Sequence, residues 1–327
     1  MNRRRYGDHV LAVFVWLSAS AIAGLFLWLL ADMASHGFDR LSWSFLTTEP
    51  ERSGRRGGIA PILVSTLVVL TITLAVAVPL GLATAVWLSE FTRVNSRSAA
   101  AIRFSLDVLA GVPSIVYGLF GSAFFCVWMG LGYSLLAGGL TLACMVLPIL
   151  IRTSEAGLAA VPDEWRQGAA ALGLSRWAAL RYLLLPAAAP ALTAGLMLGI
   201  GRALAETAVL LFTSGYVDRM PASWLDSGRV LAVHIFDLSM NVTGGDKAAY
   251  GSALVLLADR RGNGRRLQAV ERCAQPLIMV LASPTPDEGQ NLVRRGLHQS
   301  RGAQTQIACL NNLTGRPDQD VGIPDGR

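Results

Sequence analysis

Long stretches without a charged side chain constrain this sequence more than any other feature. A helix needs about 20 apolar residues to cross the hydrocarbon core of a bilayer. Five runs come close to that length or exceed it, the last with charges inside it: Val10–Ala31, Ile59–Ser89, Leu109–Tyr133, Ser134–Ile151 and Ala187–Thr213. Hydrophobic residues make up 53% of the 327 residues and charged residues only 15%, which is too apolar for an ordinary soluble domain. The sequence therefore predicts an all-α membrane protein.

A sixth apolar run starts at Tyr250 but ends at Leu257, where Asp259 and Arg260 soon follow. So short a run cannot cross a bilayer by itself. From residue 258 to 327 the sequence is polar, rich in arginine and without periodicity, so we expect a disordered tail. Because an apolar run turns abruptly into charged sequence, we hypothesise that this tail is a frameshifted or otherwise altered reading of the gene.

The first apolar run follows three consecutive arginines at positions 3 to 5. A cleaved signal peptide also starts with basic residues, but its apolar region usually has about 7–15 residues, so the longer run favours a retained anchor. The distribution of arginines favours a cytoplasmic N-terminus and a multi-pass protein of the cytoplasmic (inner) membrane. The expected organisation is an anchor helix and external loop over 1–58, a membrane domain over 59–257 and the tail over 258–327.

Several classes of function lack the residues that they need. A phosphate-binding loop of an ATPase requires a Gly-Lys-Ser/Thr sequence, and the single lysine, Lys247, stands between Asp246 and Ala248. The scattered cysteines and histidines show no metal-ligand spacing, so we expect no metal and no cofactor bound by this chain. Hydrolase and protease motifs are also absent, which argues against an enzyme. Membrane lipids, and not nucleic acid, are the expected surroundings despite the net charge of +6.

The connection over residues 152–186 is the most informative loop. Pro162, followed by Asp163 and Glu164, is a helix-start signal. Gly173 should end that helix, and Ser175 should cap a second one that ends at Pro186 as the chain re-enters the membrane. Two short helices joined by a glycine hinge at the cytoplasmic surface could form a binding site for another protein. They could equally be an interfacial linker without a partner.

Two charges fall inside the last long run, Arg202 and Glu206. A charge at the centre of a membrane helix costs about 2.5–3.5 kcal/mol, so we expect these two residues to have a structural or functional role. Their spacing of four places both on one helix face, where they could form a structural ion pair that locks helices together. Alternatively, the guanidinium could offer a transient site to an oxyanion, with Thr207 as a nearby hydroxyl donor.

Two prolines inside apolar runs predict helix kinks. Pro79 is followed by Gly81, and Pro113 lies in a Gly-Val-Pro-Ser sequence that starts at Gly111. Such residues free backbone carbonyls and permit bending where helices rock or line a cavity.

The loop over 152–186 carries a recognisable pattern. It resembles the EAA loop of importer-type ABC permeases, which reads Glu-Ala-Ala, three residues, Gly, nine residues, Ile-x-Leu-Pro. Here Gln167 replaces the acidic residue and Gly168 replaces the first alanine, while the spacing is kept throughout. The matching positions are Gln167, Gly168, Ala169, Gly173, Leu183, Leu185 and Pro186.

Two further segments, 111–120 and 201–212, resemble phosphate permeases of the PstA type. The resemblance implies a six-helix ABC importer permease core, here with the last helix truncated or altered. It also implies transport of inorganic phosphate, with Arg202 contacting the anion and Glu206 holding Arg202 or repelling competing anions. The implied partners are a second permease subunit of the PstC type, an ATPase dimer that uses the ATP, and an external phosphate-binding protein.

Other functions stay open at this point. A permease of the same kind could carry another oxyanion, such as molybdate or sulfate. The chain could also be a membrane-embedded enzyme or a scaffold without a transport role.

Overall fold

The computed structural model describes residues 2–92 and 96–257, and these residues form two compact units. Among the described residues, the first unit combines 2–73, 113–142 and 203–257. It contains α1 (Asn2–Gly37), the 3₁₀-helix η1 (Phe38–Arg40), α2 (Trp43–Thr47), β1 (Pro50–Glu51), β2 (Arg56–Gly57), α5 (Ser114–Gly121), the π-helix η3 (Ser122–Trp128), α10 (Ala208–Leu211) and α11 (Leu231–Met240).

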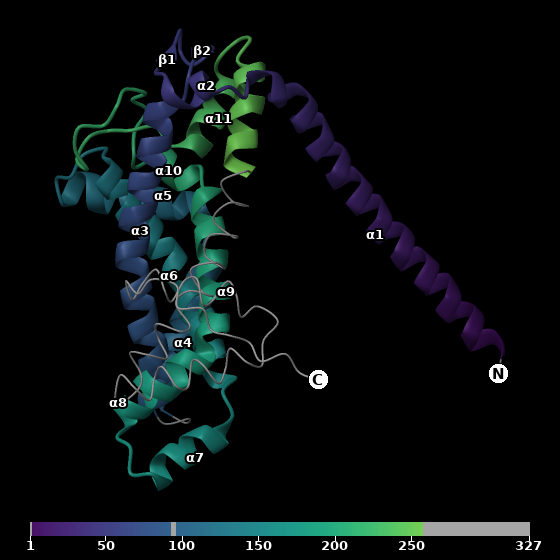
Figure 1. Ribbon diagram of the computed structural model, residues 1–327, viewed down its shortest axis with the longest axis vertical. Helices are drawn as coiled ribbons and strands as arrows, with labels where there is room; N and C mark the ends of the chain where they lie inside the picture. The colour runs from purple at the N-terminus through teal and green to yellow at the C-terminus, as the bar shows by residue number, and fades with distance from the viewer. Residues whose placement is uncertain (1, 93–95, 258–327) are drawn as a thin grey trace, which may run out of the picture. The chain divides into compact units, whose positions relative to one another are not determined.

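The second unit combines residues 74–112 and 143–202. It contains the π-helix η2 (Trp87–Phe91), α4 (Arg97–Gly111), α7 (Asp163–Ala171), α8 (Arg176–Ala179) and the π-helix η4 (Leu180–Leu184). Three long helices contribute residues to both units: α3 (Ala60–Val86), α6 (Leu135–Ala159) and α9 (Leu185–Leu204). Figure 1 shows these elements along the chain.

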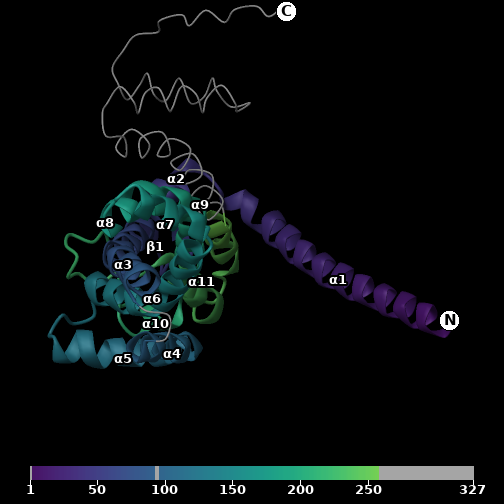
Figure 2. The same ribbon diagram turned by 90° about the horizontal axis from the view of Figure 1, so that it is seen from below.

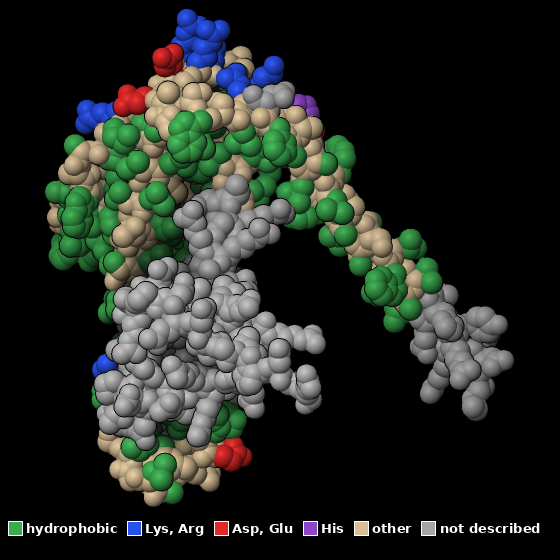
Figure 3. Space-filling model, in the orientation of Figure 1, with side chains coloured by type: hydrophobic (Ala, Val, Ile, Leu, Met, Phe, Trp, Pro, Cys, Tyr) green, Lys and Arg blue, Asp and Glu red, His purple; other side chains and the backbone are tan. Residues whose placement is uncertain are grey.

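Four helical stretches in the described residues are long and apolar enough to cross a membrane: Leu11–Gly37, Ala60–Phe91, Leu135–Ala159 and Arg176–Leu204. Each contains most of a predicted apolar run. The first, in α1, is a single uninterrupted helix in both ribbon views (Figures 1 and 2). None of its apolar window is buried, and many hydrophobic side chains stand along the coloured part of this helix (Figure 3). A helix that is apolar all round is suited to lipid.

The predicted span over Leu109–Tyr133 is wrong as a single helix. The structure has two helices there, α4 and the continuous α5–η3 pair, separated by extended backbone at Val112 and Pro113. Proline lacks an N–H group and disfavours the helical conformation of the residue before it, so Pro113 ends one helix and starts the next. Helix α4 accordingly starts at Arg97 and ends at Gly111, two residues before this proline.

Pro186 does not end a helix, contrary to the sequence prediction. The helix that begins at Arg176 passes through η4 and Pro186 into α9 and ends at Leu204. The π-helical turn immediately before Pro186 alters the hydrogen-bond register where the proline cannot donate. Pro79 likewise lies inside α3, which continues through it.

Residues 214–249 contain a helix that the sequence did not predict, α11. It packs within the first unit, where Leu231 joins a buried cluster with Phe45, Ile59 and Ile62. Gly54, in the turn between β1 and β2, has a φ of +84°, and a Cβ atom there would come within 2.8 Å of Cε1 of His234. Residues 246–257 are helical up to the last described residue. The predicted tail over 258–327 lies outside the described residues.

Candidate functional site

The loop over 152–186, which resembles an EAA loop, contains the first short helix where its sequence predicts it. Helix α7 begins at Asp163, directly after Pro162, and carries Asp163 and Glu164 in its first turn. Carboxylates in this position stabilise the partial positive charge of a helix N-terminus. Ser175 caps α8 as predicted, because its Oγ accepts a hydrogen bond from the N–H of Ala178 at 3.2 Å.

Gly173 ends α7 in a left-handed conformation with a φ of +71°. Its N–H donates to the carbonyl of Ala170, and the N–H of Leu174 donates to the carbonyl of Ala169, both at 3.0 Å. This pair of bonds is the Schellman motif, which favours glycine because other residues are strained at positive φ. The predicted hinge is therefore a defined helix end, with a geometry set by backbone hydrogen bonds.

Large apolar side chains on this coupling segment, residues 163–177, face away from the rest of the described chain. Leu172 is 79% exposed and Trp177 62% exposed, and Trp165 and Leu174 are exposed as well. Of the residues in the EAA-like pattern, Gln167 and Gly168 are exposed and Ala169 is buried, while the last three, Leu183, Leu185 and Pro186, are half-buried. Exposed clusters of this kind mark surfaces that contact a protein or a membrane.

Arg166 fixes the start of α7, although no sequence pattern marks it as a functional residue. Its Nη2 and Nε donate to the two carboxylate oxygens of Glu90 at 2.9 and 3.3 Å. Its Nη1 and Nη2 also donate to the carbonyls of Val161 and Leu158 at 2.7 and 2.9 Å. The hydrogen bond to Glu90 raises the pKa of Arg166. Only the nearby Asp163, at helical spacing, could have drawn attention to this arginine.

A second group of ion pairs joins α4 to α6 in the same unit. Arg103 Nε donates to Glu155 Oε1 at 2.6 Å, and Arg152 Nε donates to Asp107 Oδ1 at 3.1 Å. Arg152 also lies 3.5 Å from Glu155, so the four side chains form a neutral network. These arginines suit such pairs because the guanidinium fork matches a carboxylate.

The two charged residues proposed for a substrate pathway do not lie on one continuous helix. Arg202 is exposed in the last turn of α9, which ends at Leu204, whereas Glu206 and Thr207 stand in the break before α10. The predicted helical i, i+4 geometry is therefore wrong. Glu206 Oε1 accepts a hydrogen bond from the N–H of Val209 at 3.5 Å, and such local bonds compete with continued helix.

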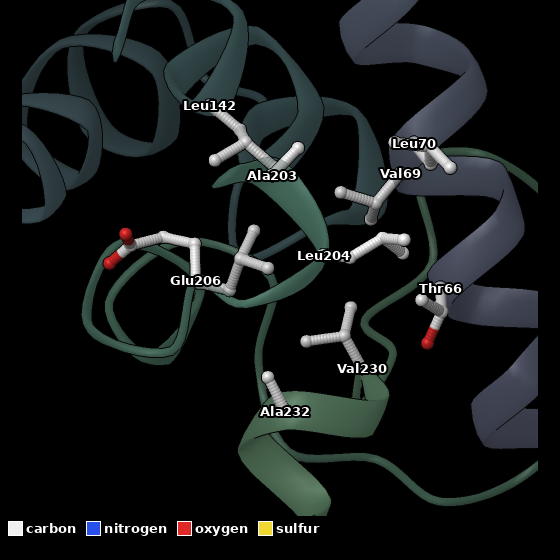
Figure 4. A pocket seen from close by; sticks show the side chains of 10 residues that line it. Thr66, Val69, Leu70, Leu142, Ala203, Leu204, Glu206, Val230 and Ala232 are labelled. Atoms are coloured by element: carbon white, nitrogen blue, oxygen red, sulfur yellow. The ribbon is translucent and has the colours of Figure 1, made fainter. Parts of the chain in front are cut away.

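Glu206 is 6% exposed and lines a cavity of about 10 Å³ in the first unit. The other lining residues come mainly from α3, α9 and the start of α11, and all but Thr66 are apolar. In Figure 4 the carboxylate points away from the apolar side chains of Leu204 and Val230. A cavity of this size holds at most about one water molecule, so it is too small for a phosphate ion.

Among residues 2–92 and 96–257, no group of three or more histidine, cysteine, aspartate or glutamate side chains is placed to hold a metal ion.

Comparison with known proteins decides the family. Residues 77–258, more than half of the chain, match the family described as the binding-protein-dependent transport system inner membrane component. The chain belongs to this family. It is an integral membrane protein, and the predicted all-α permease fold and the predicted resemblance are confirmed.

Relatives of this family member cover most of its length. The probable ABC transporter permease protein YqgI of Bacillus subtilis (strain 168) is 30% identical over 79% of this chain and 92% of its own length. The phosphate transport system permease protein PstA of Mycobacterium leprae (strain TN) is 33% identical over 83% of this chain and 92% of its own. A solved structure of the MetNI methionine ABC transporter in inward-facing conformations shares 19% identity, covers 65% of this chain and 94% of its own, and has a TM-score of 0.46.

Proposed function

We propose that this chain is the transmembrane permease subunit of an ATP-driven importer for inorganic phosphate. The observation that carries the proposal is the family match over residues 77–258, together with relatives named as phosphate transport permeases that align with most of the chain. The expected alternatives, a membrane enzyme or a scaffold, have no such support. Neither of the two relatives described above is named for molybdate or sulfate.

The proposed motor is a separate ATPase dimer, because this chain lacks the lysine of a phosphate-binding loop. The ATPase would bind the coupling segment, whose exposed apolar side chains include Leu172 and Trp177. A push on α8 would travel along one helix, since the chain is helical without a break from Arg176 to Leu204. Rigid elements with continuous backbone hydrogen bonds transmit displacement better than loops do.

The proposed assembly also contains a second permease subunit of the PstC type and an external phosphate-binding protein. The chain would lie in the cytoplasmic membrane with its N-terminus in the cytoplasm. It would bind no cofactor itself, and ATP would be consumed by the partner subunit. Lipid would surround α1, whose apolar window has no buried residue.

Within the membrane, Arg202 is the residue proposed to contact the passing anion. It stands exposed at the end of α9, and a guanidinium offers paired donors to phosphate oxygens. Thr207, half-buried after the helix end, would add a hydroxyl donor. Glu206 is buried and accepts a hydrogen bond from the N–H of Val209 in α10, so its proposed part is to hold this helix break in shape and to repel competing anions.

A competition assay tests the substrate. Cells that lack their own high-affinity phosphate importers would express the chain with its partner subunits, and uptake of labelled phosphate would be measured with excess sulfate, molybdate or unlabelled phosphate. Only unlabelled phosphate should compete. Strong competition by molybdate or sulfate would assign a different oxyanion, and no uptake above the empty-vector control would reject the proposal.

A further inference from the structure

Helix α3 continues into the π-helix η2. Arginine side chains from two other elements of the same unit donate hydrogen bonds to η2. Arg166 of α7 donates to the two carboxylate oxygens of Glu90 from its Nε and Nη2 atoms. Arg103 of α4 donates from Nη2 to the carbonyl of Leu88 at 3.4 Å. A π-helical turn leaves backbone groups in an altered hydrogen-bond register, and such turns often occur at functional sites.

The ion pair between α7 and η2 is largely buried and is reinforced by further hydrogen bonds. The Glu90 side chain is 12% exposed, so its two bonds to Arg166 form largely out of water. Arg166 is also held by the carbonyls of Leu158 and Val161, which end α6 and lead into α7. By contrast, its second carboxylate partner, Asp163, is 84% exposed, and exposed pairs of this kind contribute little.

Apolar packing supports the same connection. Val86, the last residue of α3, belongs to a buried cluster with Leu158 and Val161, and Leu180 and Leu184 of η4 join it. The segment that precedes α7 is therefore tied to the end of α3 by buried side chains as well as by the Arg166–Glu90 pair. Movement of α7 relative to η2 would break a bidentate, charge-assisted pair.

We propose that Arg166 is a positioning residue that transmits displacement of α7 through Glu90 to span α3, so that ATP use is coupled to the movement of this helix. The inference rests on the proposed function, because it assumes that a separate ATPase pushes α7. It adds a second route for the displacement, beside the continuous helix from α8 to α9. A fastening role without transmission would stabilise the fold but would leave the ratio of ATP used to anion moved unchanged.

Reconstituted full complexes in liposomes separate these roles. The variants are Arg166→Lys, which keeps the charge but removes the fork, Glu90→Gln, and the charge exchange E90R/R166E. Each complex is checked for assembly, and ATP hydrolysis and labelled phosphate uptake are measured on the same preparation. Asp107→Asn is the matched control, because it neutralises an acidic partner of an arginine between α4 and α6, away from α7.

For Arg166→Lys and Glu90→Gln we expect about a tenfold fall in uptake, with ATP hydrolysis kept within about twofold, because each variant loses the bidentate, charge-assisted geometry of the pair. The ATP used per phosphate should rise accordingly. The charge exchange should recover part of the coupling, and Asp107→Asn should leave the ratio unchanged.

Three results would overturn the proposal: an unchanged ratio in both single variants, a parallel loss of hydrolysis and uptake in assembled complexes, or failure of Glu90→Gln to assemble, which would make the pair a folding element. Failure of the proposed function would be seen in the wild-type complex and not in the variants. If the wild-type complex hydrolyses ATP but moves another oxyanion, the substrate assignment is wrong, while the same ratio measured with that anion still tests Arg166. If it moves no anion at all, both proposals fall.

Discussion

Gly173 ends α7 in a backbone conformation that strains any residue with a Cβ atom. Within the described part of the chain, no atom lies within 4 Å of the place that a Cβ atom would take, so the requirement comes from φ and not from space. Gly168 provides the opposite case, since it lies inside α7, has no positive φ and is also unobstructed by the described residues. The two glycines differ only in the conformation that they hold.

Alanine substitution should therefore act in opposite directions at these positions. We expect Gly173→Ala to lower the free energy of unfolding by about 1 kcal/mol or more. Gly168→Ala should raise it by up to about 1 kcal/mol, because alanine favours helix. Thermal unfolding of the purified protein in detergent measures both, and shifts of the same sign would contradict the assigned helix end.

His234 on α11 should make stability depend on pH. Both ring nitrogens are buried without a hydrogen-bond partner among the described residues. Burial first, and then the nearby Arg229 charge, lower the pKa of His234 to about 4, against a smaller opposing effect of Asp237. The unfolded chain therefore binds a proton more readily between about pH 6.5 and 4, so stability is full above this window and is lost as pH falls through it.

The loss should approach about 3 kcal/mol at pH 4, from the difference between an ordinary histidine pKa and the lowered one. Melting temperatures in detergent, recorded from pH 7.5 to 4, would show it. His234→Leu removes the titrating group at similar volume and should flatten this part of the profile. A profile that is equally steep in the variant would assign the pH dependence to other groups.

At the scale of elements, close approach between helices depends on small residues. Gly121 ends α5, and a Cβ atom there would clash with the Thr141 side chain of α6. Thr141 is fully buried, so it has little room to move. Close contacts of this kind are typical of helix interfaces in membranes.

Gly121→Val should force these two segments apart and lower the free energy of unfolding by about 1–3 kcal/mol. Gly111→Val is the matched control, because none of the described residues comes within 4 Å of a Cβ atom at that position. Fluorescence-detected size exclusion after graded heating reports the difference. If Gly121→Val has the same melting temperature as the wild type, the packing assigned to α5 and α6 is incorrect.

Hydrophobic runs predicted most of the long helices, because twenty apolar residues have few alternatives in a membrane protein. The breaks at Val112–Pro113 and after Leu204 were harder to place. Pro113 interrupts a helix whereas Pro79 and Pro186 do not, and this depends on whether neighbouring turns can adjust. Helix α11 was missed because its ten residues are too few to stand out from a loop of mixed polarity.

The candidate site was only partly predictable for a related reason. Local signals gave the helix start at Pro162, the end at Gly173 and the cap at Ser175, since these depend on residues close in sequence. The Arg166–Glu90 pair joins residues 76 positions apart, so no local pattern reveals it. Likewise, the spacing of Arg202 and Glu206 places both on one helix face only if the helix continues past Arg202. Helix α9 ends at Leu204, so this prediction failed.

At the scale of the whole molecule, Arg202 should separate transport from assembly. Arg202→Ala removes the proposed anion contact at an exposed helix end, so phosphate uptake should fall to background while the complex with the ATPase still forms. Arg202→Lys keeps the charge without the fork and should retain part of the uptake. Copurification and labelled uptake are measured together. Wild-type uptake in Arg202→Ala would place this arginine among structural residues.

The central claim is that this permease moves phosphate only when a separate ATPase works on it. The most direct measurement is uptake of labelled phosphate into liposomes that contain the chain, its partner permease subunit and the ATPase, with the binding protein added outside. We predict accumulation that requires ATP and the binding protein and that stops when the catalytic lysine of the ATPase is replaced. Accumulation without ATP, or none in the complete system, would contradict the account.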